Sequence, residues 1–117
     1  MFEKIIEKAK KDKKVIAVLL FGSMARGEEN RDIDICLVLN KKYSNLELSK
    51  KKIEYSSFGF DVSVFQQLPV YIKIRILKEG KILLNRDEPL LYEIAFSTIK
   101  EFGFYKKIYD LYLREVK

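Results

Sequence analysis

Apolar and polar residues follow two different periods in the first forty positions of the chain. Between Phe2 and Lys13 the apolar residues recur at helical spacing and lysines occupy the other side, which predicts an amphipathic helix. Val15–Phe21 is an unbroken apolar run rich in β-branched residues, as is typical of a strand buried on both faces. Ile35–Leu39 is a second apolar run and predicts a second strand. A loop must therefore connect two buried strands in this region.

The middle of the chain carries a helix signal followed by a strand signal. Ser44 and Glu47 have the spacing of a capping box, which predicts a helix that runs to about Ile53. Phe60–Phe65 alternates between two faces, which predicts a third strand with Asp61 on the same face as Ser63. An aspartate inside an alternating strand is therefore available at one sheet face.

The segment after this strand has helical boundary signals. Pro69 lies where a first turn is expected and Gly80 follows the last helical position, which predicts a helix between them. The β-branched alternation inside the segment also fits a strand, so a strand remains the competing interpretation. Ile82–Leu84 then predicts a short strand at a sheet edge, and a last helix begins near Asp87.

The last predicted helix is unusually apolar, with Gly103 as a weak point. Its apolar residues surround the helix and do not form a single stripe: Phe102, Phe104, Tyr105, Ile108, Tyr109, Leu111, Tyr112, Leu113 and Val116. Such a helix must bury more than one face. Packing across its own sheet is the simplest explanation. The surplus of tyrosines, which suit interfaces, motivates the hypothesis that part of the helix docks a partner or forms a homo-oligomer.

The loop between the first two strands has features of a phosphate-binding turn. Gly22 permits a tight turn or a close backbone approach, and Ser23 offers a hydroxyl that can cap a short helix. Backbone N–H groups in such a turn point to one place and favour an anion such as a phosphate. Arg26 could add a forked cationic donor for the same phosphate.

Two aspartates open the second strand. Asp32 and Asp34 point to the same side because side chains alternate along a strand, and their Cα atoms would be about 6.6 Å apart. Two ionised carboxylates at this separation repel unless a cation lies between them. Hard oxygen ligands of this kind suit Mg²⁺, which completes its shell with water and substrate phosphate. A phosphate turn next to a metal pair indicates nucleotide chemistry.

The order Gly22-Ser23-x-Ala25-Arg26-Gly27 followed by Asp32-x-Asp34 resembles the minimal nucleotidyltransferases of the DNA polymerase beta superfamily. The resemblance implies an α+β fold, with a mixed sheet of about four strands flanked by helices, and one domain over residues 1–117. It also implies a third carboxylate on a later strand, and Asp61 is in a run of the right kind.

The resemblance further assigns roles to the site residues. It implies two Mg²⁺ ions and catalysis at Asp32, Asp34 and Asp61, with ATP bound by Gly22, Ser23 and Arg26. The family includes MntA-like antitoxins encoded beside HEPN-type ribonuclease toxins, which transfer AMP to a tyrosine of the toxin. The chain is too small for a dedicated substrate-binding lobe, which agrees with a protein acceptor that supplies the contact surface itself.

The chain departs from the family pattern in the loop before the aspartate pair. Family members usually have a longer loop with a serine directly before the pair, whereas here only residues 28–31 intervene and Arg31 takes that place. The alternative function is therefore a non-catalytic antitoxin that neutralises its partner by contact alone.

Composition excludes several other classes of protein. The chain has 117 residues, 48% of them apolar, which suits one domain with a real core, and no histidine, which excludes Ser-His and Cys-His catalysis. The single cysteine, Cys36, and the absence of a secretory signal or long apolar run predict a cytoplasmic protein without a membrane span. The net charge is +6, but the basic residues are scattered, so we expect no nucleic-acid partner.

Overall fold

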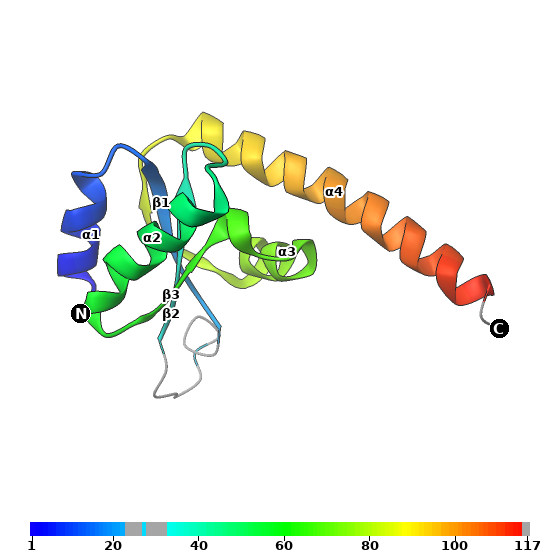
Figure 1. Cartoon of the computed structure of the whole chain (residues 1–117), viewed down its shortest axis with the longest axis horizontal. Helices are drawn as coiled ribbons and strands as arrows, with labels where there is room; N and C mark the ends of the chain where they lie inside the picture. Colours follow the sequence, from blue (N-terminus) through cyan, green and yellow to red (C-terminus); the bar gives the residue numbers. More distant parts are fainter. Residues whose placement is uncertain (23–26, 28–32, 116–117) are drawn as a thin grey trace.

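The computed structural model describes residues 1–22, 27 and 33–115, and four helices and four strands lie within this part of the chain (Figure 1). In chain order they are α1 (Glu3–Lys10), β1 (Val15–Phe21), β2 (Asp34–Leu39), α2 (Asn45–Tyr55), β3 (Asp61–Val64), α3 (Val70–Glu79), β4 (Lys81–Asn85) and α4 (Glu88–Glu115). Short 3₁₀ turns at Ser56–Phe58 and Phe65–Gln67 flank β3.

The strands form one mixed sheet in the order β3–β2–β1–β4. The strand β1 pairs antiparallel with β2 and with β4, and β2 pairs parallel with β3. The two unbroken apolar runs occupy the centre of the sheet, because only central strands bury both faces. This arrangement confirms the predicted α+β fold with a mixed sheet of about four strands, and β4 lies at an edge as expected.

Helices cover both faces of the sheet. On one face α1 and α2 pack through Ile5, Leu48 and Tyr55, which belong to the same buried cluster as Val18 and Leu37. On the other face α3 and the first part of α4 pack through buried apolar side chains against β1 and β2. This second cluster includes Ile16, Leu19, Cys36, Val38, Phe65, Ile76 and Leu91.

The capping box predicted for α2 is present. Ser44 is the N-cap, and its Oγ accepts a hydrogen bond from the backbone N–H of Glu47 at 3.2 Å. The helix ends at Tyr55, two residues beyond the predicted end. Residues 70–79 are helical, so the competing strand interpretation of that segment is wrong, and Pro69 is the N-cap residue of α3 and does not lie in its first turn. Burial of Ile74 and Ile76, the latter against the sheet, outweighs their preference for strands.

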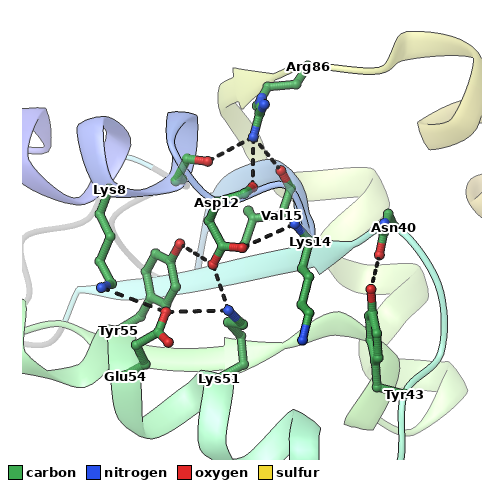
Figure 2. Close-up of polar contacts among 11 residues, drawn as sticks. Lys8, Asp12, Lys14, Val15, Asn40, Tyr43, Lys51, Glu54, Tyr55 and Arg86 are labelled. Atoms are coloured by element: carbon green, nitrogen blue, oxygen red, sulfur yellow. Dashed lines mark hydrogen bonds and ion pairs between the residues drawn. The ribbon is translucent and has the colours of Figure 1, made fainter.

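A polar cluster joins four elements at the end of the sheet where β1 begins (Figure 2). The carboxylate of Asp12 accepts hydrogen bonds from Lys51 Nζ at 2.6 Å and from the Tyr55 hydroxyl at 2.9 Å, both on α2. Arg86, directly after β4, donates to the carbonyl oxygens of Ala9, Asp12 and Val15. These bonds fasten the α1–β1 turn to α2 and to the end of β4.

The helix α4 extends beyond the rest of the protein (Figure 1). Leu91 and Thr98 are buried in its first half, whereas every residue from Gly103 to Glu115 is exposed. Packing across its own sheet therefore explains only the first half of this helix. Gly103 does not interrupt it. No helix in the described part of the chain is long and apolar enough to cross a membrane.

Candidate functional site

Gly22 lies directly after β1 and has a backbone conformation that glycine favours. Its φ is +77°, in the left-handed region where a side chain is costly. A Cβ atom at this position would overlap Oδ2 of Asp34. Gly22 is therefore needed both for its conformation and for the space that the Asp34 carboxylate occupies. The close backbone approach that the sequence allowed at this residue is confirmed.

Asp34 and Asp61 are direct neighbours in the sheet. Asp34 opens β2 and Asp61 opens β3, and the two residues are partners in the parallel register. Phe21, the last residue of β1, is the antiparallel partner of Asp34 on the other side. Adjacent strands are about 4.8 Å apart, so the two aspartates start within about 5 Å of each other at the Cα atoms. The backbone N–H of Asp61 donates to the carbonyl of Ile33 at 2.9 Å and fixes this register.

Both aspartates lie on the sheet face that α3 and α4 cover. In β2 the side chains of Cys36 and Val38 belong to the buried cluster on that face, and Asp34 shares their alternation. In β3, Val62 and Val64 belong to the cluster on the opposite face, so Asp61 points the other way, toward the side of Asp34. Asp34 is half-buried and Asp61 is exposed. A ligand could therefore approach both carboxylates from one side.

Cys36 lies on the same face, two residues after Asp34. It is fully buried, and burial raises the pKa of its thiol far above the usual range. A thiol that stays protonated is a poor nucleophile. Cys36 is therefore a packing residue.

Three of the predicted site residues, Ser23, Arg26 and Asp32, lie outside the described residues, as does Arg31. Within the described part of the chain the site consists of Gly22, Asp34 and Asp61, and no group of three possible metal ligands occurs there. Two hard carboxylates that converge beside a glycine turn nevertheless fit a divalent cation that also binds phosphate oxygens.

The polar cluster around Asp12 was not predicted from the sequence. Lys51 lies in a run of three lysines, a pattern typical of an exposed helix end, but its side chain is only 12% exposed and pairs with Asp12. Burial alone would raise the pKa of Asp12, but hydrogen bonds from Lys51 and Tyr55 outweigh it and leave the pKa lowered. No short-range pattern links positions 12 and 51, so this contact gave no signal in the sequence.

A mixed four-stranded sheet, with a glycine turn after its central strand and neighbouring carboxylates on the next two strands, defines a nucleotidyltransferase-like domain. The family described as "Polymerase beta, Nucleotidyltransferase" matches residues 3–89, which include all three described site residues. The chain belongs to this family of nucleotidyltransferases.

A relative from Methanocaldococcus jannaschii supports the same membership. That protein, provisionally named a protein adenylyltransferase, is 39% identical over 89 residues, which are 74% of this chain and 69% of the relative. The resemblance to minimal nucleotidyltransferases is therefore confirmed at the level of sequence.

Two solved structures share the fold. A chain from the crystal structure of a toxin–antitoxin with AMP-PNP has a TM-score of 0.73 at 21% identity, covering 99% of this chain and 98% of its own. A chain from a tri-AMPylated Shewanella oneidensis HEPN toxin in complex with its MNT antitoxin has a TM-score of 0.68 at 19% identity, covering 97% and 94%. At these identities the likeness shows the fold alone.

Proposed function

We propose that this chain transfers AMP from ATP to a hydroxyl group of a protein, a tyrosine of a HEPN-type toxin, and acts as its antitoxin. The juxtaposition of Gly22, Asp34 and Asp61 at one end of the sheet carries this proposal, because it puts a phosphate-compatible turn beside two carboxylates. The relative named as a protein adenylyltransferase and the neighbour with AMP-PNP support the choice of nucleotide. The neighbour with an AMPylated HEPN toxin supports the acceptor.

The roles of the described residues follow from their positions. The backbone at Gly22 binds the phosphates of ATP beside Asp34, whose carboxylate lies against this glycine because the Cβ is missing. Asp34 and Asp61, with Asp32, hold the divalent cations, for which Mg²⁺ is the best match to carboxylate and phosphate oxygens. Mg²⁺ would neutralise the phosphate charge as it shifts during transfer.

The chemical step is a displacement at phosphorus. The acceptor tyrosine oxygen attacks the α-phosphorus, the bond to the bridging oxygen breaks, and pyrophosphate leaves. The exposed carboxylate of Asp61 receives the proton of the acceptor hydroxyl. The protein contributes mainly orientation and charge neutralisation, which account for most of the rate acceleration in phosphoryl transfer.

The experiment is an intact-mass measurement on the HEPN-type protein from the same genome, after incubation with the chain, ATP and Mg²⁺. We expect a mass increase of whole AMP units. Asp34→Asn should nearly abolish it while the thermal unfolding midpoint stays close to wild type, because Asp34 is half-buried and the substitution conserves its volume. Asp87→Asn is the matched control, because Asp87 caps α4 through the N–H of Leu90 and asparagine caps equally well.

Transfer that persists in Asp34→Asn would contradict the assignment of the site. A HEPN-type protein that is inhibited without any mass increase would instead support the alternative, an antitoxin that acts by contact alone.

A further inference from the structure

The last part of α4 is not covered by any other residue in the described part of the chain. We call residues 103–115 the overhang; all of them are exposed, and the helix projects away from the sheet (Figure 1). The ion pair between Lys73 on α3 and Glu101, at 4.0 Å, ties α4 to α3 just before the overhang begins. Large apolar side chains nevertheless continue beyond it, with exposures from 38% to 70%: Phe104, Tyr105, Ile108, Tyr109, Leu111, Tyr112 and Leu113.

The core-facing stripe of α4 continues into the overhang. In the first half this stripe contains Leu91 and Thr98, which are buried against the body. Steps of three and four residues along the same side lead to Tyr105, Tyr109 and Tyr112. The rings of Tyr105 and Tyr109 stack with centroids 6.2 Å apart, and so form a continuous aromatic surface. The overhang thus exposes the continuation of the helix face that is buried against the sheet and α3 in the first half of α4.

A second apolar stripe lies beside the tyrosines. Phe104, Ile108 and Leu111 recur at the same three- and four-residue steps. At about 100° per residue the two stripes together span roughly 160° of the helix. One packed helix covers a stripe of about 100°, so two neighbouring helices are needed to cover this arc. The overhang therefore has the form of a helix that inserts into a groove.

The exposed area has the size of a protein interface. Seven large side chains that are about half exposed present roughly 700 Å², if each offers about 200 Å² in full. A standard interface buries about 800 Å² on each partner, whereas monomers rarely expose more than a few hundred in one apolar patch. An isolated helix of this length is also marginal in water, so a partner would stabilise its conformation.

Charge identifies the kind of partner. Opposite the two stripes, Lys106, Lys107 and Arg114 share the polar side of the overhang with one acid, Asp110, while a second acid, Glu115, falls within the arc of the stripes. A second copy of the chain also has a net charge of +6, so its basic side chains would repel those beside the overhang. It would also contribute a single overhang helix, whereas two helices are needed to cover the apolar arc. A protein with acidic residues around its groove would pair with this rim.

We propose that the overhang docks into an apolar groove between two helices of the acceptor protein, and that carboxylates line the rim of this groove. The inference rests on the proposed function for the identity of the acceptor, a HEPN-type protein. Docking at the overhang would raise the local concentration of the acceptor near the nucleotide site.

The first test uses the chain alone. Light scattering at increasing concentration should give the monomer mass, and hydrogen exchange of residues 103–115 should be fast. A dimer whose mass reverts to the monomer in Tyr109→Lys would overturn the proposal and make a second copy the occupant of this surface.

The second test uses the complex with the HEPN-type protein from the same genome. Residues 103–115 should become protected from exchange, and Tyr109→Lys and Ile108→Lys should each weaken binding at least about thirtyfold, as expected for residues at the centre of an interface. Phe96→Lys is the matched control, because Phe96 is 65% exposed on the same helix but lies outside both stripes. Its affinity should stay within about threefold of wild type.

The two proposals fail in different ways. Unchanged affinity in both stripe variants, or no protection of the overhang in the complex, would overturn docking while AMP transfer could continue. An intact complex protected at the overhang, but without any AMP transfer, would contradict the enzymatic function and leave the docking surface in place.

Discussion

Gly22→Ala tests the close approach between the glycine turn and Asp34. The new methyl group faces two obstacles, because Gly22 has φ of +77° and its Cβ would overlap the carboxylate oxygen Oδ2 of Asp34. The first obstacle lowers stability and the second displaces a site residue. The chain offers a variant that separates them. Gly59 has φ of +84°, but a Cβ there would meet no atom within 4 Å.

The expected magnitudes follow from these two effects. A left-handed conformation costs an alanine about 1–2 kcal/mol, so Gly22→Ala and Gly59→Ala should both lower the free energy of unfolding by about this amount. Only Gly22→Ala also requires the Asp34 carboxylate to move, by on the order of 1 Å. Misplacement of a reacting group by about 1 Å can lower a rate about a hundredfold. We therefore expect AMP transfer to fall about a hundredfold in Gly22→Ala alone.

The assay combines urea unfolding of both variants with the intact-mass measurement of AMP transfer. Calorimetry with ATP and Mg²⁺ reports nucleotide binding separately from transfer. Wild-type transfer in Gly22→Ala, at any stability, would refute the inferred contact with Asp34. An equal loss of transfer in Gly59→Ala would show that backbone strain, and not displacement of Asp34, is the cause.

Three further predictions concern the Asp12 cluster, the cap of α2 and the metal. Asp12→Asn should cost about 1–3 kcal/mol of stability at neutral pH, measured by urea unfolding, because it removes the shorter of the two ion pairs of the half-buried Lys51 and leaves only Glu54, at 3.4 Å. The folded-state pKa of Asp12 is lowered, so the stabilisation from its ionised carboxylate is present above the unfolded pKa of about 3.9 and is lost as pH falls through the folded value. Asp12→Asn should therefore lose less stability than wild type as the pH falls below about 4. Equal slopes of the free energy of unfolding against pH in the two proteins would contradict this. Ser44→Ala should lower stability by about 1 kcal/mol through loss of the N-cap, and an unchanged unfolding midpoint would refute that role. Chelation of divalent cations should abolish most ATP binding in calorimetry while the circular dichroism spectrum stays unchanged, and metal-independent binding would contradict the carboxylate site.

Local patterns in the sequence predicted the elements and part of the site. The apolar run Val15–Phe21, the capping box at Ser44 and the alternation around Asp61 each depend on residues a few positions apart, so their periods are visible without a structure. The suitability of glycine at position 22 was visible for the same reason, because its left-handed backbone conformation is a local property.

Only the tertiary structure decided how distant residues meet. The parallel pairing of β2 and β3 puts Asp61 beside Asp34, which is 27 positions earlier in the chain. The close approach of Gly22 to the Asp34 carboxylate depends in the same way on the register of the strands. Strand register does not follow from any short-range pattern in one sequence. The contact of Asp12 with Lys51 is of the same kind. The apolar pattern of α4 predicted that more than one of its faces is buried. The sheet and α3 extend only along the first half of α4, so they determine where its burial ends. Beyond Glu101 the helix therefore presents a core-like face to the outside of the molecule.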